Sequence, residues 1–160
     1  MKPHGFTLVE LVMTIVVVGA LAVVVLPRMD LLNGFDEVGY RDKVRATLEF
    51  ARKTAVAQRR KVCVQLASDD LTLTIDNSAP ETSTSTCVTG LARNLNLPVS
   101  DKTCDGAGNK ICNPPGVTLK SPNNAFSISP LGQPSAGVTY TVSGRSDYIV
   151  SVEAETGYVH

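Results

Sequence analysis

The sequence predicts an α+β protein in which one long N-terminal helix packs on a head built from a mostly antiparallel β-sheet. Residues 6–26 are almost entirely apolar, and residues 40–60 carry apolar side chains at steps of three and four, the period of a helix with one buried face. Beyond residue 61, apolar and polar residues alternate in short runs separated by turn-forming residues, which is typical of antiparallel strands. One long helix before one such sheet gives an α+β arrangement.

The apolar stretch over residues 6–26 predicts a transmembrane helix. As a helix these 21 residues would span about 31 Å, close to the roughly 30 Å hydrocarbon core of a bilayer. A secretory signal is cleaved after its apolar segment, whereas here the small residue suited to cleavage, Gly5, comes before it. We therefore expect the helix to remain in the mature protein. Lys2 and His4 precede it, and the positive-inside tendency favours a cytoplasmic N-terminus.

Glu10 is unusual for a plain membrane anchor. A charged side chain within the nonpolar layer costs about 2.5 to 3.5 kcal/mol on insertion scales, so the carboxylate needs a cationic partner. If cleavage follows Gly5, the new α-amine of Phe6 is the obvious cation, from the same chain or from a neighbouring copy. The alternative is that Glu10 is a tolerated polar residue near one end of an uncleaved anchor, where it snorkels toward lipid headgroups.

The N-terminal segment also matches a known pattern. It reads Gly5-Phe6-Thr7-Leu8-Val9-Glu10-Leu11, followed by an apolar stretch and Pro27. This order resembles the start of type IV prepilins and type II secretion pseudopilins. The resemblance implies that a prepilin peptidase cuts between Gly5 and Phe6 and methylates the Phe6 amine. It also implies that Glu10 pairs with a neighbour's amine in a filament and that Pro27 kinks the helix.

The same resemblance implies a location and a set of partners. The protein would be a single-pass inner-membrane protein with a cytoplasmic N-terminus and a periplasmic head, and would later enter a pilus or pseudopilus. Its partners would be other major and minor pilins or pseudopilins, the prepilin peptidase, an inner-membrane assembly platform and, before assembly, membrane lipid. The expected segments are a prepilin leader (1–5), a transmembrane and filament-core helix (6–27), a linker with an amphipathic helix (28–61) and the β-rich head (62–160).

The order of elements after the apolar stretch follows from local pattern. Two glycines and a proline between residues 27 and 40 predict flexibility or a kink before the amphipathic helix of residues 40–60. The sheet is expected to pack on the apolar stripe of residues 44–55. Segments rich in turn-forming residues, 77–90 and 94–116, are predicted to be loops. The predicted strands are 62–66, 71–75, 117–119, 126–128, 138–142 and 148–152, with a last short segment at 157–159.

Three segments after the apolar stretch make the family resemblance more specific. Residues 126–132, Phe-Ser-Ile-Ser-Pro-Leu-Gly, and residues 156–159, Thr-Gly-Tyr-Val, are similar to the H-type minor pseudopilins and their relatives. Residues 55–64, Ala-Val-Ala-Gln-Arg-Arg-Lys-Val-Cys-Val, look most like the C-type minor pilin of the mannose-sensitive haemagglutinin pilus. The resemblance implies a minor subunit that helps initiate or cap assembly of a type IV pilus or type II secretion pseudopilus. The alternative is a binding module at the filament tip, whose loops at 77–116 contact DNA, a secreted substrate or a host surface.

The net charge of the chain argues against one mode of binding. Lys plus Arg and Asp plus Glu both number 15, so the formal net charge of zero argues against binding of nucleic acid or anionic lipid by overall charge. Residues 41–61 form a basic stretch, in which eight Lys and Arg residues oppose only Asp42 and Glu49. Some H-type minor pilins take part in DNA uptake, so four of these cations are candidate phosphate contacts: Arg52, Arg59, Arg60 and Lys61. The favoured alternative is a solvated helix face, and DNA is not a favoured partner.

The four cysteines all lie beyond the apolar stretch, on the side expected to be oxidising. Their spacings lack the close pairs of structural zinc sites, so two disulfides are predicted and no metal site. Three connectivities are open, and the preferred one is Cys63 with Cys87 and Cys104 with Cys112, because each pair closes a local loop. The chain-entropy account gives these bonds about 3.5 and 2.6 kcal/mol respectively.

Neither an enzyme nor a cofactor is expected. The only histidines are His4, in the leader, and His160, the last residue, so no central histidine is available to activate a nucleophile. One loop has a faintly calcium-like set of residues but lacks the alternate-residue oxygen spacing of an EF-hand, so a disulfide-closed turn is the preferred interpretation. Its residues are Asp101, Asp105, Gly106, Gly108 and Asn109.

Overall fold

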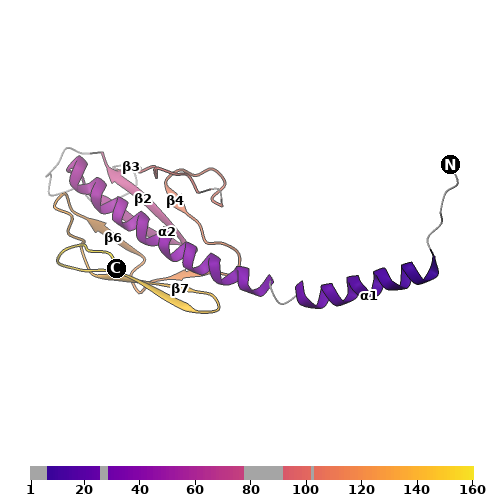
Figure 1. Ribbon diagram of the computed structural model, residues 1–160. Helices are drawn as coiled ribbons and strands as arrows, with labels where there is room; N and C mark the ends of the chain where they lie inside the picture. The colour runs from indigo at the N-terminus through magenta and orange to yellow at the C-terminus, as the bar shows by residue number, and fades with distance from the viewer. Residues whose placement is uncertain (1–6, 26–28, 78–91, 102) are drawn as a thin grey trace. The chain divides into compact units, whose positions relative to one another are not determined.

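The computed structural model describes residues 7–25, 29–77, 92–101 and 103–160 (Figure 1). Two helices lie within these ranges, α1 (Leu8–Val25) and α2 (Met29–Gln58). The chain divides into two compact units, Met1–Phe35 and Asp36–His160. The second unit contains the head and most of α2.

α1 covers most of the predicted transmembrane segment. Its 18 residues correspond to about 27 Å of helix, slightly less than the roughly 30 Å hydrocarbon core. Among the residues that the structure describes, no helix combines the length and the apolar character needed to cross a membrane. The predicted segment 6–26 extends at both ends beyond the described residues. Gly5, Phe6 and Pro27 lie outside them.

α2 starts earlier than the amphipathic pattern predicts. The sequence predicts a flexible or kinked segment before Tyr40, but the structure has helix from Met29 onward. Each helical glycine costs about 1 kcal/mol relative to alanine, a cost that the rest of a 30-residue helix can offset. Gly39 also has open space around its α-carbon, so no close contact disturbs the helix there.

The strands in the described part of the chain form two antiparallel sheets. The five-stranded sheet has the order β3-β2-β1-β6, with β4 also paired to β2, and the three-stranded sheet has the order β5-β7-β8. The strands are β1 (Val62–Ala67), β2 (Asp70–Asp76), β3 (Ala92–Asn94), β4 (Lys110–Ile111), β5 (Thr118–Lys120), β6 (Ala125–Ile128), β7 (Val138–Ser143) and β8 (Asp147–Val152).

The α+β class and the antiparallel pairing are confirmed, but the sheets differ in detail from the sequence prediction, which did not include β3. The strands divide between two sheets instead of forming one. The short strand β4 lies inside 94–116, which was predicted to be a loop, because Leu71 and Thr72 of β2 pair with Ile111 and Lys110. Residues 78–91, which contain most of the other predicted loop, lie outside the described residues.

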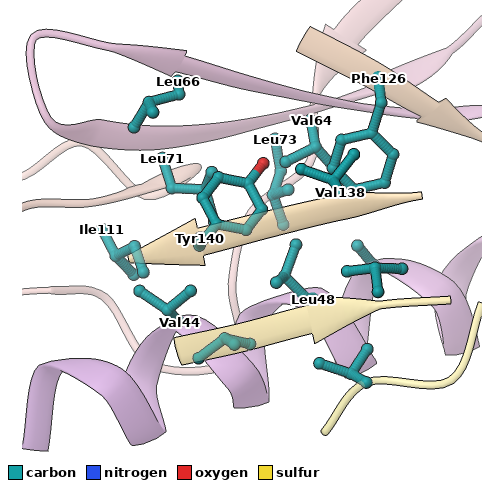
Figure 2. Close-up of a cluster of buried hydrophobic side chains, with 14 of the residues drawn as sticks. Val44, Leu48, Val64, Leu66, Leu71, Leu73, Ile111, Phe126, Val138 and Tyr140 are labelled. Carbon is teal, nitrogen blue, oxygen red and sulfur yellow. The ribbon is translucent and has the colours of Figure 1, made fainter. Parts of the chain in front are cut away.

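Side chains from α2 and from both sheets meet in one hydrophobic core (Figure 2). Val44 and Leu48 of α2 are fully buried together with Leu73 of β2 and Tyr140 of β7. Burying one such side chain contributes about 1.5 to 3 kcal/mol. The predicted apolar stripe of α2 is thus the surface on which the sheets pack.

A disulfide joins Cys104 to Cys112, with a Cα–Cα distance of 5.4 Å. It closes a loop with a sequence separation of 8, and β4 lies inside this loop, directly before Cys112. Cys63, on β1, is also disulfide-bonded. Cys87, its predicted partner, lies outside the described residues.

Candidate functional site

Glu10 lies in the first turn of α1, and its side chain is exposed. Thr7 precedes the helix, and its carbonyl and hydroxyl oxygens accept hydrogen bonds from the Glu10 amide, at 3.1 and 3.3 Å. Thr7 therefore acts as an N-cap. A carboxylate in the first turn is also favoured by the helix dipole. The N-terminus of the helix therefore stabilises the Glu10 carboxylate. The insertion cost of an isolated charge does not include this effect.

The four candidate phosphate contacts are not gathered into one exposed patch. Arg60 is half-buried, and its Nη1 donates to the carbonyls of Asp76 and Asn77, at 3.1 and 2.7 Å. Lys61 is half-buried and makes an interaction of its own. Arg52 is half-buried on α2, and of the four only Arg59 is exposed. The structure thus uses Arg60 to tie the helix end to β2.

Asp101 connects the disulfide loop to α2. Its Oδ1 accepts hydrogen bonds from the hydroxyl and amide of Thr103, at 2.7 and 3.1 Å. Its Oδ2 accepts from the Cys112 amide at 3.3 Å and from Lys43 Nζ at 3.0 Å. Burial raises the pKa of Asp101, but these donors outweigh burial and hold the pKa below its ordinary value of 3.8. The carboxylate is therefore charged and fully partnered.

This arrangement accounts for the calcium-like residues. Asp101 uses its oxygens on protein donors, and Asp105 and Gly106 adopt positive φ angles in a turn. Among the described residues, no group of three or more His, Cys, Asp or Glu side chains is placed to hold a metal ion. The loop is a turn closed by the Cys104–Cys112 disulfide.

An open groove of about 600 Å³ lies beside Asp101. Phe50 on α2 and the segment 97–99, Leu-Pro-Val, line it, and Val99 is 80% exposed. The cation that lines it, Lys43, is paired with Asp101. The groove therefore presents mainly apolar surface with a neutralised ion pair at its edge.

Glu37 ties the start of the head's helix to the hairpin between β7 and β8. It is only 3% exposed, and its carboxylate accepts hydrogen bonds from the amides of Arg145 and Ser146, the latter at 3.2 Å. A Cβ at position 144 would overlap this carboxylate, so a side chain there would have to displace Glu37. No sequence signal identified Glu37, because its partners are backbone amides more than 100 positions away.

The comparisons with known proteins agree with this organisation. Residues 1–26 match the prokaryotic N-terminal methylation motif. No curated protein sequence matches the chain. The fold is similar to that of the minor pseudopilin EpsH from the type 2 secretion system of Vibrio cholerae, with a TM-score of 0.57 at 12% identity over 78% of this chain and 94% of that one.

The type IV minor pilin FimU of Pseudomonas aeruginosa is also similar, with a TM-score of 0.50 at 14% identity over 82% of this chain and 89% of that one. At such identities the likeness concerns the fold. The chain thus has a prepilin-type methylation motif on a pilin-like fold.

Proposed function

We propose that this chain is a minor pilin or pseudopilin subunit, which helps to initiate or cap assembly of a type IV pilus or type II secretion pseudopilus. The observation that carries the proposal is the methylation motif over residues 1–26, joined to a head with a pilin-like fold. The fold is similar to that of a minor pilin and to that of a minor pseudopilin, which supports a minor subunit. This likeness does not distinguish a type IV pilus from a type II secretion system.

The proposed mechanism begins with processing of the leader. A prepilin peptidase would cut between Gly5 and Phe6, and the methylated amine of Phe6 would become the new N-terminus. Glu10 would then pair with the amine of a neighbouring subunit, because a carboxylate in a nonpolar filament core needs a cation. Its exposed position in the first turn of α1 supports this role, since a carboxylate there can reach another chain.

Before assembly, the methylation motif supports anchoring in the inner membrane, with the head in the periplasm. The disulfide Cys104–Cys112 supports an oxidising compartment for the head. The assembly platform would take the processed subunit from the membrane into the filament. The role is structural, with the chain acting through contacts and not through catalysis.

Replacing Glu10 with alanine tests the mechanism. We expect Glu10→Ala to reduce incorporation into filaments at least tenfold, because the neighbour's amine loses its partner, while the membrane fraction still contains the protein. Thr14→Ala is the matched control: Thr14 is an exposed polar residue of the same helix, whose hydroxyl donates to the Leu11 carbonyl at 2.8 Å. Immunoblots of sheared filaments and of membranes measure both quantities.

Mass spectrometry of the mature N-terminus separates a defect in processing from a defect in assembly. Wild-type protein should begin with methylated Phe6, and Glu10→Ala should be cleaved like the control. Normal incorporation of Glu10→Ala would exclude the carboxylate–amine mechanism. A wild-type chain that keeps Met1 to Gly5 in cells with an active peptidase would exclude the prepilin assignment.

Recognition of a polypeptide at the filament tip is a second candidate function. The groove beside Asp101 favours it, because an apolar lining with a neutralised ion pair suits a secreted or host protein better than DNA. Val99→Asp would place a charge at the groove. If Val99→Asp assembles into normal filaments but no longer binds the secreted or host protein, the result supports recognition. If binding is unchanged, recognition at this groove is excluded.

A further inference from the structure

One wall of the groove beside Asp101 is held to α2 by a single ion pair. This wall is the segment 97–101, Leu-Pro-Val-Ser-Asp, and Lys43 and Phe50 line the groove from α2. Within the described part of the chain, residues 98–100 make no hydrogen bond between backbone groups. The ion pair between Asp101 and Lys43 Nζ, at 3.0 Å, is therefore the polar link between the wall and the helix.

The disulfide fixes the donors that hold the Asp101 carboxylate. The Asp101 side chain is only 5% exposed. One of its oxygens accepts from the amide and hydroxyl of Thr103, and the other accepts from the Cys112 amide. Thr103 directly precedes Cys104, and Cys112 is the other half of the bond. The crosslink therefore keeps two separate donor residues on the same buried carboxylate.

Without the disulfide, these two donor residues lie on separate parts of an open loop. Gly106 and Gly108 lie between them and add backbone freedom to the dithiol form. A buried carboxylate that loses its donors is more stable in water. Since Asp101 belongs to the wall, the wall would move with it, and Lys43 would lose its carboxylate. The Lys43 side chain, already 42% exposed, would then be solvated.

The far side of the loop is attached to the five-stranded sheet independently of the disulfide. Asn109 Nδ2 donates to the Leu73 carbonyl at 3.1 Å, and β4 pairs with β2. Lys110 Nζ also pairs with Asp70, at 3.1 Å. None of these contacts involves Asp101. We therefore expect loss of the disulfide to release the wall of the groove and to leave the rest of the head folded.

We propose that oxidation of Cys104 and Cys112 completes the groove, so that this binding surface forms only after the head meets a protein with a reactive disulfide. The two thiols give two electrons and two protons to that disulfide, which becomes a dithiol as the Cys104–Cys112 bond forms. The cysteines are then 2% and 7% exposed, which shields the bond from reductants. Use of the groove for recognition rests on the second candidate function, but its dependence on the disulfide does not.

Lysine acetylation of the full-length protein in detergent micelles tests the proposal. Cys104→Ser and Cys112→Ser together remove the disulfide, and peptide mass spectrometry measures how fast acetic anhydride modifies Lys43. We expect this rate to be at least threefold above that of wild type, because an ammonium paired with a buried carboxylate reacts slowly. Lys120, an exposed residue of β5 that does not line the groove, is the internal control and should keep its rate.

Methyl NMR of the same samples reports on the groove itself. The signals of Leu97 and Val99 should shift or broaden without the disulfide, because both residues belong to the wall. The signals of Leu48 and Val142, which are fully buried in the core, should keep their positions. Loss of these core signals as well would mean that the disulfide holds the whole head, which would overturn the proposal.

Asp101→Asn provides the reference for a released Lys43. It keeps both cysteines but removes the charge that pairs with Lys43, so acetylation should rise by a similar factor. A doubly substituted protein in which either Lys43 acetylation or the wall signals stay at wild-type values would also overturn the proposal. These measurements need no partner protein. A groove that binds no polypeptide would therefore exclude the second candidate function without affecting this result.

Discussion

Tyr40 and Tyr140 are buried tyrosines of the same core that differ by one hydrogen bond. Tyr40 Oη donates to the Asp69 carbonyl at 3.0 Å. The Tyr140 hydroxyl has no partner within the described residues, and Figure 2 shows it among apolar side chains. Burial raises the pKa of both phenols, so both hydroxyls keep their protons near neutral pH. The two residues therefore isolate the effect of one bond on stability.

Replacing each tyrosine with phenylalanine should have opposite effects. Tyr140→Phe removes a buried hydroxyl without a partner, so we expect the free energy of unfolding to rise by about 1 kcal/mol. Tyr40→Phe removes a made hydrogen bond and should lower it by about 1 kcal/mol. Differential scanning calorimetry measures both changes. A loss of stability in Tyr140→Phe equal to that in Tyr40→Phe would contradict the assignment of an unpartnered hydroxyl.

Asp101 should make the stability of the head depend on pH. Its pKa is lower in the folded chain than the ordinary 3.8, so the carboxylate stabilises the fold above about pH 4. That contribution is lost as the pH falls through the folded pKa. We expect Asp101→Asn to lower stability at pH 7 by about 1 to 3 kcal/mol, with a smaller difference from wild type below pH 4.

Urea unfolding at pH 7 and at pH 3 checks this prediction. Asp105→Asn is the control, because Asp105 is exposed in the same disulfide loop and should show little difference at either pH. A wild-type advantage over Asp101→Asn that stays constant from pH 7 to pH 3 would mean that the charge of Asp101 does not hold the loop.

At the scale of one element, α2 ends in a backbone motif that normally uses glycine. The Arg60 amide donates to the Ala55 carbonyl at 3.1 Å, and the Arg59 amide to the Val56 carbonyl at 3.3 Å. Arg59 has a φ of +49°. This pattern is a Schellman motif with arginine in the left-handed position. An L-residue with a Cβ is strained there by about 1 kcal/mol.

Arg59→Gly should therefore stabilise the protein by up to about 1 kcal/mol, because glycine adopts this conformation freely. Arg59→Ala removes the same side chain but keeps the Cβ, so it should leave stability nearly unchanged. Thermal unfolding of the two variants side by side separates the backbone effect from the loss of charge. Equal melting temperatures for the glycine and alanine variants would show that the strain is absent.

At the scale of the whole molecule, the sequence predicted the class and most of the order of elements. The period-two runs place β1 and β2 correctly, since alternation of apolar residues directly reflects the two faces of a strand. The short strand β4 could not be predicted, because its two residues have no period and become a strand only by pairing with β2. The division into two sheets depends on such long-range pairings too.

The candidate site was predictable only where the signal is local. The methylation motif is a continuous run of residues, and the match over residues 1–26 agrees with the resemblance drawn from it. The Thr7-to-Glu10 spacing of a helix N-cap is also readable in the sequence. By contrast, the contact of Glu37 with the amides of Arg145 and Ser146 joins residues 108 and 109 positions apart, and no local pattern brings them together.

The carboxylate of Glu37 has a mechanical consequence. If α2 is pulled from its N-terminal end, the tension enters the compact unit that begins at Asp36. Glu37 is the next residue, and its bonds to the Arg145 and Ser146 amides fasten that entry point to the hairpin between β7 and β8. Part of the load would therefore pass to the three-stranded sheet before it reaches Tyr40 and the core. The hairpin would thus reduce the force on the core.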